Sequence, residues 1–541
     1  MRSQAASRVS FDEPALDTLP DTVGGQIARA LAEMGVTTVF GVISIHNMPI
    51  LDGIAEQGLI RFVPARGEAG AMNMADAYAR VAGGLGVVLT STGTAAGNAA
   101  GGQAEALTAG SPILHITTQV DLSHAARDRA PIHDVPKQPE MLKGISKAYF
   151  RIWDAASVIG TLSAACSAAL SAPTGPVSLE VPVDVQRMAP VTTARAYPPV
   201  IVRPLASDAA IDELAARVKA ARRPLLWLGG GARGAAAEAT ELVARGFVPE
   251  DNAASLGAFN MTREAEEIYA SSDLMIVVGS RLRGNETRDN KLPLPRQLVQ
   301  IDADAERCGK NYPVAQFLHG DAADTLQRLL ERLPAKLDTD PTMPHDIASA
   351  RARSEGALRE RLGPYQIVAD HLLGRVQAGR HPWVRDVTIS NSTFGNRYVT
   401  VAAPNLGVHA AGGGIGQGIA MGIGAALASP DAKAVTLLGD GGAMLGMAEL
   451  ITAVDEGANL VYLLMNDAAY GVIQNIQDAQ YGGRRHYSAL KTPNFAKLCD
   501  AIDMPHMRVD SIEAFPDAFD AAMKVAGPVV LEVDMVAIGP F

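Results

Sequence analysis

Cysteine is scarce in this sequence, and long apolar runs are absent. The 541 residues include three cysteines, Cys166, Cys308 and Cys499, with no CxxC pair and no Cys/His cluster. This spacing argues against a disulfide framework or a zinc site, and it fits a reducing cytoplasm. No segment is apolar enough over a sufficient length to span a bilayer, so we expect no membrane partner.

Basic residues are fewer than acidic ones. Lys and Arg number 47 against 58 Asp and Glu, which gives a formal charge of -11, and the basic residues form no block. This charge balance argues against nucleic acid or an anionic membrane as the main partner and leaves small molecules. A chain that is 48% hydrophobic and 19% charged can bury several cores, and its length suggests about three or four domains.

Short Val/Ile/Leu runs alternate with Ala-rich stretches in three parts of the chain. Examples are "TTVFGVI" and "SPILHITTQ" near the start, "PLLWLGGGA" and "LMIVVGS" in the middle, and "AVTLLGD" and "LVYLLMND" near the end. Such alternation is typical of βαβ units, so we predict three α/β domains with parallel sheets. We expect a loosely packed lead-in over residues 1–20, followed by domains over 21–195, 200–335 and 360–541.

Two strand-like runs near the C-terminus end in acidic or amide residues. The first ends at Gly439-Asp440-Gly441-Gly442, and the second at Asn466-Asp467. The carboxyl ends of neighbouring parallel strands meet at one edge of a sheet, where two carboxylates can hold Mg²⁺ against phosphate groups. The alternative is a tight glycine turn and an ordinary end of a strand.

With this spacing, the chain resembles the thiamine diphosphate-dependent enzymes of the acetolactate synthase, benzoylformate decarboxylase and benzaldehyde lyase group. The family motif begins Gly-Asp-Gly and ends in a double Asn. The resemblance covers nearly the whole chain. It implies a pyrimidine-binding first domain, a central domain and a diphosphate-binding last domain. It also implies that Mg²⁺ is held by Asp440, by Asp467, which replaces the second Asn of the motif, and by the backbone oxygen of Ala469.

The resemblance also implies a catalytic acid, Glu68, in "ARGEAGAMNMADAYAR". A carboxyl group beside the aminopyrimidine ring shifts the cofactor toward the tautomer that removes its C2 proton. Without the family register, Glu68 would be interpreted as an exposed glutamate that stabilises a helix start through the helix dipole.

Further cofactor contacts follow from the same resemblance. Ile415 is the bulky apolar residue expected between the two cofactor rings, and Gly413 the residue whose carbonyl meets the amino group. The diphosphate is expected to contact the hydroxyls of Ser392 and Thr393 and the loops that carry Gly441, Gly442, Tyr470 and Gly471. Glycines at a helix start, and Ser-Thr in a loop, are also common as packing and capping devices.

Two histidines are candidates for proton transfer to the substrate. By the resemblance, His46 in "VFGVISIHNMPI" falls in the loop where benzaldehyde lyase-like members have a histidine, and His133 in "APIHDVPKQP" falls where many relatives have a Gln that approaches the substrate. Two neutral imidazoles could move protons to and from an alkoxide. The alternative is that each histidine is only structural.

The expected substrate pocket is mainly apolar. Ile45, Tyr470, Val472 and Ile473 would line it, with Gln474 as a further polar group, and the helix from Gly471 onward begins with neither a cation nor Trp. Because an unpaired buried anion is unfavourable, such a pocket suits an aldehyde or acyloin better than a second carboxylate.

The implied activity is a Mg²⁺-dependent C–C lyase or ligase acting on 2-hydroxyketones, aldehydes or 2-oxo acids through a C2 carbanion and an enamine. Alternatives are an acetolactate synthase-like enzyme, a 2-oxo acid decarboxylase, or a non-catalytic relative. Two features hint at a non-catalytic relative: Gly67 stands where relatives often have His, and the central domain is shortened. "LGGGARG" resembles a flavin-contacting loop, but non-flavin members keep similar glycines, so the sequence favours no FAD.

The family also implies an assembly. The pyrimidine half of each active site is expected on one chain and the diphosphate half on another, in a homodimer that pairs into a dimer of dimers. The cytoplasm is the expected location.

Overall fold

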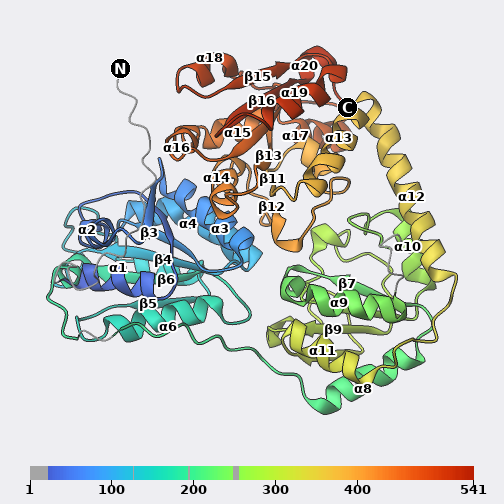
Figure 1. The fold of residues 1–541 in the computed structure, drawn as a ribbon, viewed down its shortest axis with the longest axis horizontal. Helices are drawn as coiled ribbons and strands as arrows, with labels where there is room; N and C mark the ends of the chain where they lie inside the picture. The colour runs from blue at the N-terminus through green and yellow to red at the C-terminus, as the bar shows by residue number, and fades with distance from the viewer. Residues whose placement is uncertain (1–21, 126, 193–194, 248–254) are drawn as a thin grey trace. The chain divides into compact units, whose positions relative to one another are not determined.

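The computed structural model describes residues 22–125, 127–192, 195–247 and 255–541, and this part of the chain contains three parallel sheets (Figure 1). It divides into two compact units. The first holds residues up to Leu170, Thr174–Val200 and Gly446–Ala458, and the second holds Ser171–Pro173, Ile201–Leu445 and Asn459–Phe541. The expected lead-in over residues 1–20 lies outside the described residues.

The first unit is built on a six-stranded sheet of order β2-β1-β3-β4-β6-β5. Its central strands are buried on both faces, as expected for a parallel sheet covered by helices. The strands are β1 (Thr38–Gly41), β2 (Arg61–Pro64), β3 (Gly86–Thr90), β4 (Ile113–Gln119), β5 (Ala148–Arg151) and β6 (Val177–Pro182). The helices are α1 (Val23–Glu33), α2 (Met48–Gln57), α3 (Glu68–Ala82), α4 (Thr94–Ala109), α5 (Gln138–Gly144), α6 (Val158–Leu170), α7 (Val183–Gln186) and α16 (Glu449–Asp455).

The second unit contains two sheets. The smaller has the order β10-β9-β8-β7, with strands β7 (Pro224–Leu228), β8 (Leu274–Val278), β9 (Leu298–Asp302) and β10 (Gln316–His319). Its helices are α8 (Asp208–Ala220), α9 (Ala236–Leu242), α10 (Arg263–Ser271), α11 (Ala322–Arg332) and α12 (Met343–Leu362).

The larger sheet of the second unit has the order β12-β11-β13-β14-β16-β15. Its strands are β11 (Trp383–Arg385), β12 (Gly407–His409), β13 (Ala434–Gly439), β14 (Leu460–Asn466), β15 (His506–Val509) and β16 (Val529–Asp534). The helices are α13 (Gln366–Ala378), the π-helix η7 (Asn391–Gly395), α14 (Gly418–Ala428), α15 (Asp440–Gly446), α17 (Gly471–Gln480), α18 (Phe495–Asp500), α19 (Phe515–Ala522) and α20 (Met535–Ile538).

The first and last sheets have one topology. Adding ten to each strand number of the order β2-β1-β3-β4-β6-β5 gives the order of the last sheet. The smaller sheet, between them in the sequence, has four described strands. The prediction of an α/β fold with three α/β domains and parallel sheets is therefore confirmed, whereas the domain boundaries remain predictions.

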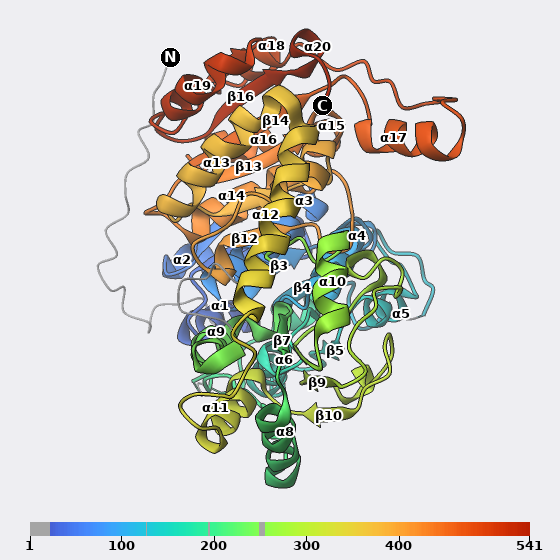
Figure 2. The same ribbon diagram turned by 90° about the vertical axis from the view of Figure 1, so that its right-hand side faces the viewer.

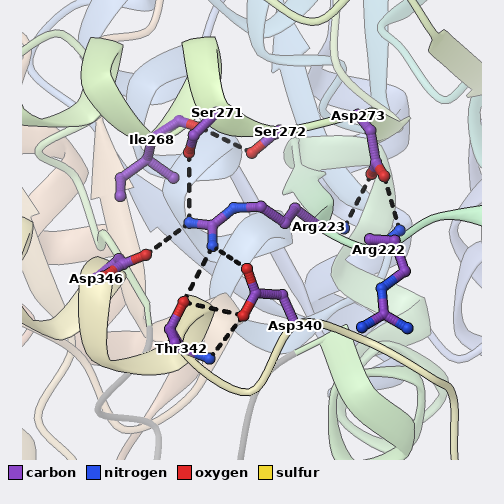
Figure 3. A network of polar contacts seen from close by, with 9 residues as sticks. All are labelled: Arg222, Arg223, Ile268, Ser271, Ser272, Asp273, Asp340, Thr342 and Asp346. Carbon is purple, nitrogen blue, oxygen red and sulfur yellow. Dashed lines mark hydrogen bonds and ion pairs between the residues drawn. The ribbon is translucent and has the colours of Figure 1, made fainter.

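The helix α12 leads from the smaller sheet of the second unit to the larger one. A polar network around Arg223 holds its start (Figure 3): the guanidinium donates to Asp340 and Asp346, each at 2.7 Å. Asp273 accepts the backbone N–H groups of Arg222 and Arg223 at 2.7 and 3.0 Å. This network fixes α12, seen as one long helix in Figure 2, whose last turn lines a cavity beside Asp467.

The glycine-rich loop after β7 packs against the loop after β8. A Cβ atom on Gly229 would lie 2.3 Å from the carbonyl oxygen of Gly279, and a Cβ atom on Gly231 would lie 2.9 Å from the Cα atom of Gly279. The contact between the two backbones accounts for these glycines without a ligand. Among the described residues, no helix has both the length and the apolar character that a membrane span requires.

Candidate active site

Asp440 and Asp467 lie at the ends of two paired strands of the second unit. Asp440 follows β13 and begins α15, and Asp467 follows β14; the register pairs Gly439 with Met465. Asp440 is fully buried, and no described donor bonds to its carboxylate oxygens. The two carboxyl groups can bond each other only by sharing a proton. Burial, followed by the contact with Asp467, therefore raises the pKa of Asp440, and burial raises the pKa of Asp467.

Small residues surround this pair. A Cβ atom on Gly471 would lie 2.5 Å from Oδ2 of Asp467, and one on Gly441 would lie 2.5 Å from the ring of Tyr470. A later part of the chain binds the segment after Asp467: the N–H of Tyr470 donates to the carbonyl of Ser488 at 2.8 Å. Ala469 forms an isolated bridge with Ala489 in the same place.

Asp386, which the sequence analysis missed, organises the glycine loops. It follows β11, is 1% exposed, and accepts the N–H of Gly416 with both oxygens at 3.1 Å and the N–H of Val387 at 2.7 Å. A Cβ atom on Gly442 would lie 2.6 Å from Oδ2 of Asp386 and 3.5 Å from Cγ1 of Ile415. Gly413 and Gly416 both have positive φ, which favours glycine. Asp386 thus joins the segment that carries Gly442 to the loop that carries Ile415.

The hydroxyls of Ser392 and Thr393, on η7, donate to backbone carbonyls of the residues just before it. Ser392 Oγ bonds the carbonyl of Thr388 at 3.2 Å, and Thr393 Oγ1 bonds those of Ile389 and Ser390 at 3.0 and 3.1 Å. A hydroxyl has one proton to donate, so neither side chain can donate to a diphosphate without rotating.

A cavity of about 210 Å³ lies beside these groups. Thr393, Asp467 and Asn475 line it together with apolar side chains and Arg361. Small-molecule sites usually exceed about 300 Å³, so this cavity has room for only part of a cofactor.

The expected pocket residues Val472, Ile473 and Gln474 lie on α17, none of whose residues is buried; the helix projects from the rest of its unit in Figure 2. Arg485 donates to Oε1 of Gln474 at 3.2 Å and forms an ion pair with Asp478. Because Arg485 follows the helix in the sequence, the start of the helix alone gave no sign of a cation beside Gln474.

In the first unit, the structure brings His46 and His133 together. Their ring centroids are 5.3 Å apart at an interplanar angle of 87°. His46 is 7% exposed, and its Nδ1 has no described partner. Burial, and then the charge of His133, lowers the pKa of His46, which keeps its imidazole neutral near pH 7. The neighbouring Ile45 is 51% exposed.

His133 is held in a left-handed backbone conformation, with φ of 67°. A Cβ atom on Gly93 would lie 2.2 Å from the His133 carbonyl oxygen. The N–H of Gly93 donates to the buried side chain of Gln138, which in turn donates to Glu180. Buried polar contacts therefore fix the segment against which His133 rests.

Glu68 is the first residue of α3 and is partly exposed. Its Oε2 accepts a hydrogen bond from Nδ2 of Asn98, on α4, at 3.1 Å. Asn98 is a second residue that the sequence analysis missed, because only the packing of α3 on α4 brings it to Glu68.

Family models match three parts of the chain. Their descriptions are thiamine pyrophosphate enzyme, N-terminal TPP binding domain (residues 21–141), central domain (211–329) and C-terminal TPP binding domain (388–533). Thiamine pyrophosphate is another name for thiamine diphosphate.

Individual relatives are similar over most of their length. A probable 2-ketoarginine decarboxylase of Pseudomonas aeruginosa is 32% identical over 84% of this chain and 83% of its own. A probable acetolactate synthase large subunit of Methanocaldococcus jannaschii is 25% identical over 94% of this chain and 90% of its own. The acetolactate synthase large subunit of Haemophilus influenzae is 27% identical over 92% of this chain and 91% of its own. The chain therefore belongs to the thiamine pyrophosphate enzymes and is a thiamine diphosphate-dependent enzyme of the lyase or transferase kind.

Proposed function

We propose that Asp440 and Asp467 hold Mg²⁺ with the backbone oxygen of Ala469, and through it the diphosphate of the cofactor. The observation that carries this proposal is the contact between the carboxyl groups of the buried Asp440 and the half-buried Asp467. Asp440 is buried, its oxygens have no described hydrogen-bond partner, and it lies beside the half-buried Asp467. Such a pair is unfavourable unless a cation or a proton balances it, and Mg²⁺ prefers hard oxygen ligands and keeps phosphate oxygens in its shell. The Asp that replaces an Asn of the family motif adds a negative charge that strengthens the attraction.

The surrounding residues fit the cofactor. Gly441 and Gly442 would donate their backbone N–H groups to a diphosphate, and Ile415 lies beside Gly442. When bound, thiamine diphosphate supplies an electron sink for the carbon atom of the substrate carbonyl group. Glu68, oriented by Asn98, would hold or donate a proton at a ring nitrogen of the aminopyrimidine.

For the reaction, we propose cleavage or formation of the C–C bond next to a carbonyl group, with decarboxylation of a 2-oxo acid placed first. One relative is named as a 2-ketoarginine decarboxylase, and Arg485, beside Gln474, would bind a substrate carboxylate by exchanging its partner Asp478. His46, as a neutral imidazole, and His133 beside it would pass a proton to and from the substrate oxygen.

A second candidate is cleavage of 2-hydroxyketones or ligation of aldehydes. It is favoured by the apolar side chains Ile45, Val472 and Ile473, because a neutral substrate needs no charged partner. An acetolactate synthase-like activity is the third alternative, as two of the relatives carry that name.

One experiment separates these activities. Purified protein with thiamine diphosphate and Mg²⁺ is given 2-oxo acids, acyloins and aldehydes, and CO₂, aldehyde and ligation product are all quantified. Release of CO₂ and an aldehyde from a 2-oxo acid as the fastest reaction supports decarboxylation. Faster acyloin cleavage supports the second candidate, faster acetolactate formation from pyruvate supports the third, and turnover of none of these compounds contradicts all three.

A further inference from the structure

Glu449 is a buried carboxylate for which the proposed reaction has no use. It begins α16 in the first unit and is 5% exposed. Among the described residues, no Lys or Arg side chain forms an ion pair with it. Its Oε1 accepts the backbone N–H groups of Arg66 at 3.1 Å and Gly67 at 3.0 Å, and its Oε2 accepts the Thr452 hydroxyl at 2.7 Å.

The two N–H groups belong to the start of α3. Gly67 is the residue before the helix, and Glu68 is its first residue. The N–H groups at a helix start lack partners within the helix, and the side chain of the residue before the helix usually accepts one of them. Gly67 has no side chain to cap the helix; Glu449, from another helix, instead binds the N–H groups of the two residues that precede α3, Arg66 and Gly67.

Gly70 leaves the space for this contact. A Cβ atom on Gly70 would lie 2.0 Å from Oε1 of Glu449, so a larger residue there forces the carboxylate away. Two other acids of this segment, Asp455 and Glu456, form ion pairs with Arg66 and Arg61. Arg66 and Asp455 are 32% and 50% exposed, and Arg61 is 47% exposed although its partner Glu456 is only 10% exposed. Ion pairs with an exposed partner stabilise little. Glu449 is therefore the contact that fixes the backbone just before Glu68.

We propose that Glu449 is a positioning residue for Glu68: by binding the N–H groups of Arg66 and Gly67, it sets where α3 begins and hence where the Glu68 carboxylate lies. This inference rests on the role proposed for Glu68. A displacement of about 1 Å in an acid–base group can slow its reaction by up to about a hundredfold, so the effect is measurable.

The test uses the full-length enzyme saturated with thiamine diphosphate and Mg²⁺. The rate of deuterium exchange at C2 of the cofactor is measured by proton NMR after acid quench, alongside cofactor affinity and thermal stability. Glu449→Ala removes the acceptor, whereas Glu449→Gln keeps one oxygen for both N–H groups. Gly70→Ala displaces the carboxylate independently, and Gly97→Ala is the control, because nothing lies within 4 Å of a Cβ atom there.

We expect Glu449→Ala and Gly70→Ala to slow exchange by about tenfold or more, and Glu449→Gln and Gly97→Ala to stay within about threefold of wild type. Gly70→Ala decides the question if Glu449→Ala does not fold. A lower thermal stability with exchange unchanged in the saturated enzyme overturns the proposal and leaves Glu449 a purely structural cap. If Glu68→Gln, measured in parallel, exchanges at the wild-type rate, the role of Glu68 is wrong and the inference falls with it.

Discussion

Asp386 accepts the N–H of Gly416 with both of its carboxylate oxygens, each at 3.1 Å. Gly416 directly follows Ile415. Asp386 also lies so close to Gly442 that a Cβ atom there would be 2.6 Å from its Oδ2. One buried carboxylate thus sets the spacing between two loops expected to contact the cofactor.

The same carboxylate makes stability depend on pH. Burial raises the pKa of Asp386 from 3.8 to about 6, so the folded protein favours its protonated form. The contribution of Asp386 to the free energy of unfolding is therefore fully present below about pH 4. It falls by about 3 kcal/mol as the pH rises through 6. We predict that the stability of wild type relative to Asp386→Asn falls between pH 4 and 6.5. Urea unfolding followed by tryptophan fluorescence measures the free energy of unfolding of both proteins, since Trp383 is buried near Asp386. The same pH dependence in wild type and Asp386→Asn would contradict the prediction.

His46→Ala is predicted to lower kcat more than it raises KM, by about a hundredfold, because a proton relay acts in the transition state. Steady-state kinetics on the best substrate of the screen measures both constants. His345→Ala, an exposed position on α12, is the control and should match wild type. An unchanged kcat in His46→Ala would show that the histidine pair is structural.

The strand-end motif was predictable from the sequence because Asp440, its glycines and Asp467 form a local pattern. Asp386, Asn98 and Glu449 were not, since long-range packing decides their partners; Glu449 and Gly67 are 382 residues apart. Arg485 was missed because Gly482 and Gly483, both with positive φ, turn the chain back along α17. Ser392 and Thr393 lie in a π-helix that no sequence pattern indicated, and their hydroxyls bond the carbonyls just before it.

A site shared between two chains predicts complementation. Glu68→Gln and Asp440→Ala chains are each expected to be nearly inactive, and mixed dimers of the two should contain one intact site. We predict partial recovery of activity after subunit exchange of the two variants. Glu68→Gln exchanged with itself is the control, and an equally low activity in the mixture would count against a shared site.

The central claim is that Asp440 and Asp467 bind the cofactor through Mg²⁺, and calorimetric titration of thiamine diphosphate tests it most directly. With Mg²⁺, wild type and Asp431→Asn, an exposed aspartate before β13, should bind equally well. Removal of Mg²⁺ by a chelator, or Asp440→Asn, should weaken binding by about a hundredfold or more, since each removes a charged contact of about 3 kcal/mol. Equal affinity with and without Mg²⁺, or in wild type and Asp440→Asn, would contradict the account.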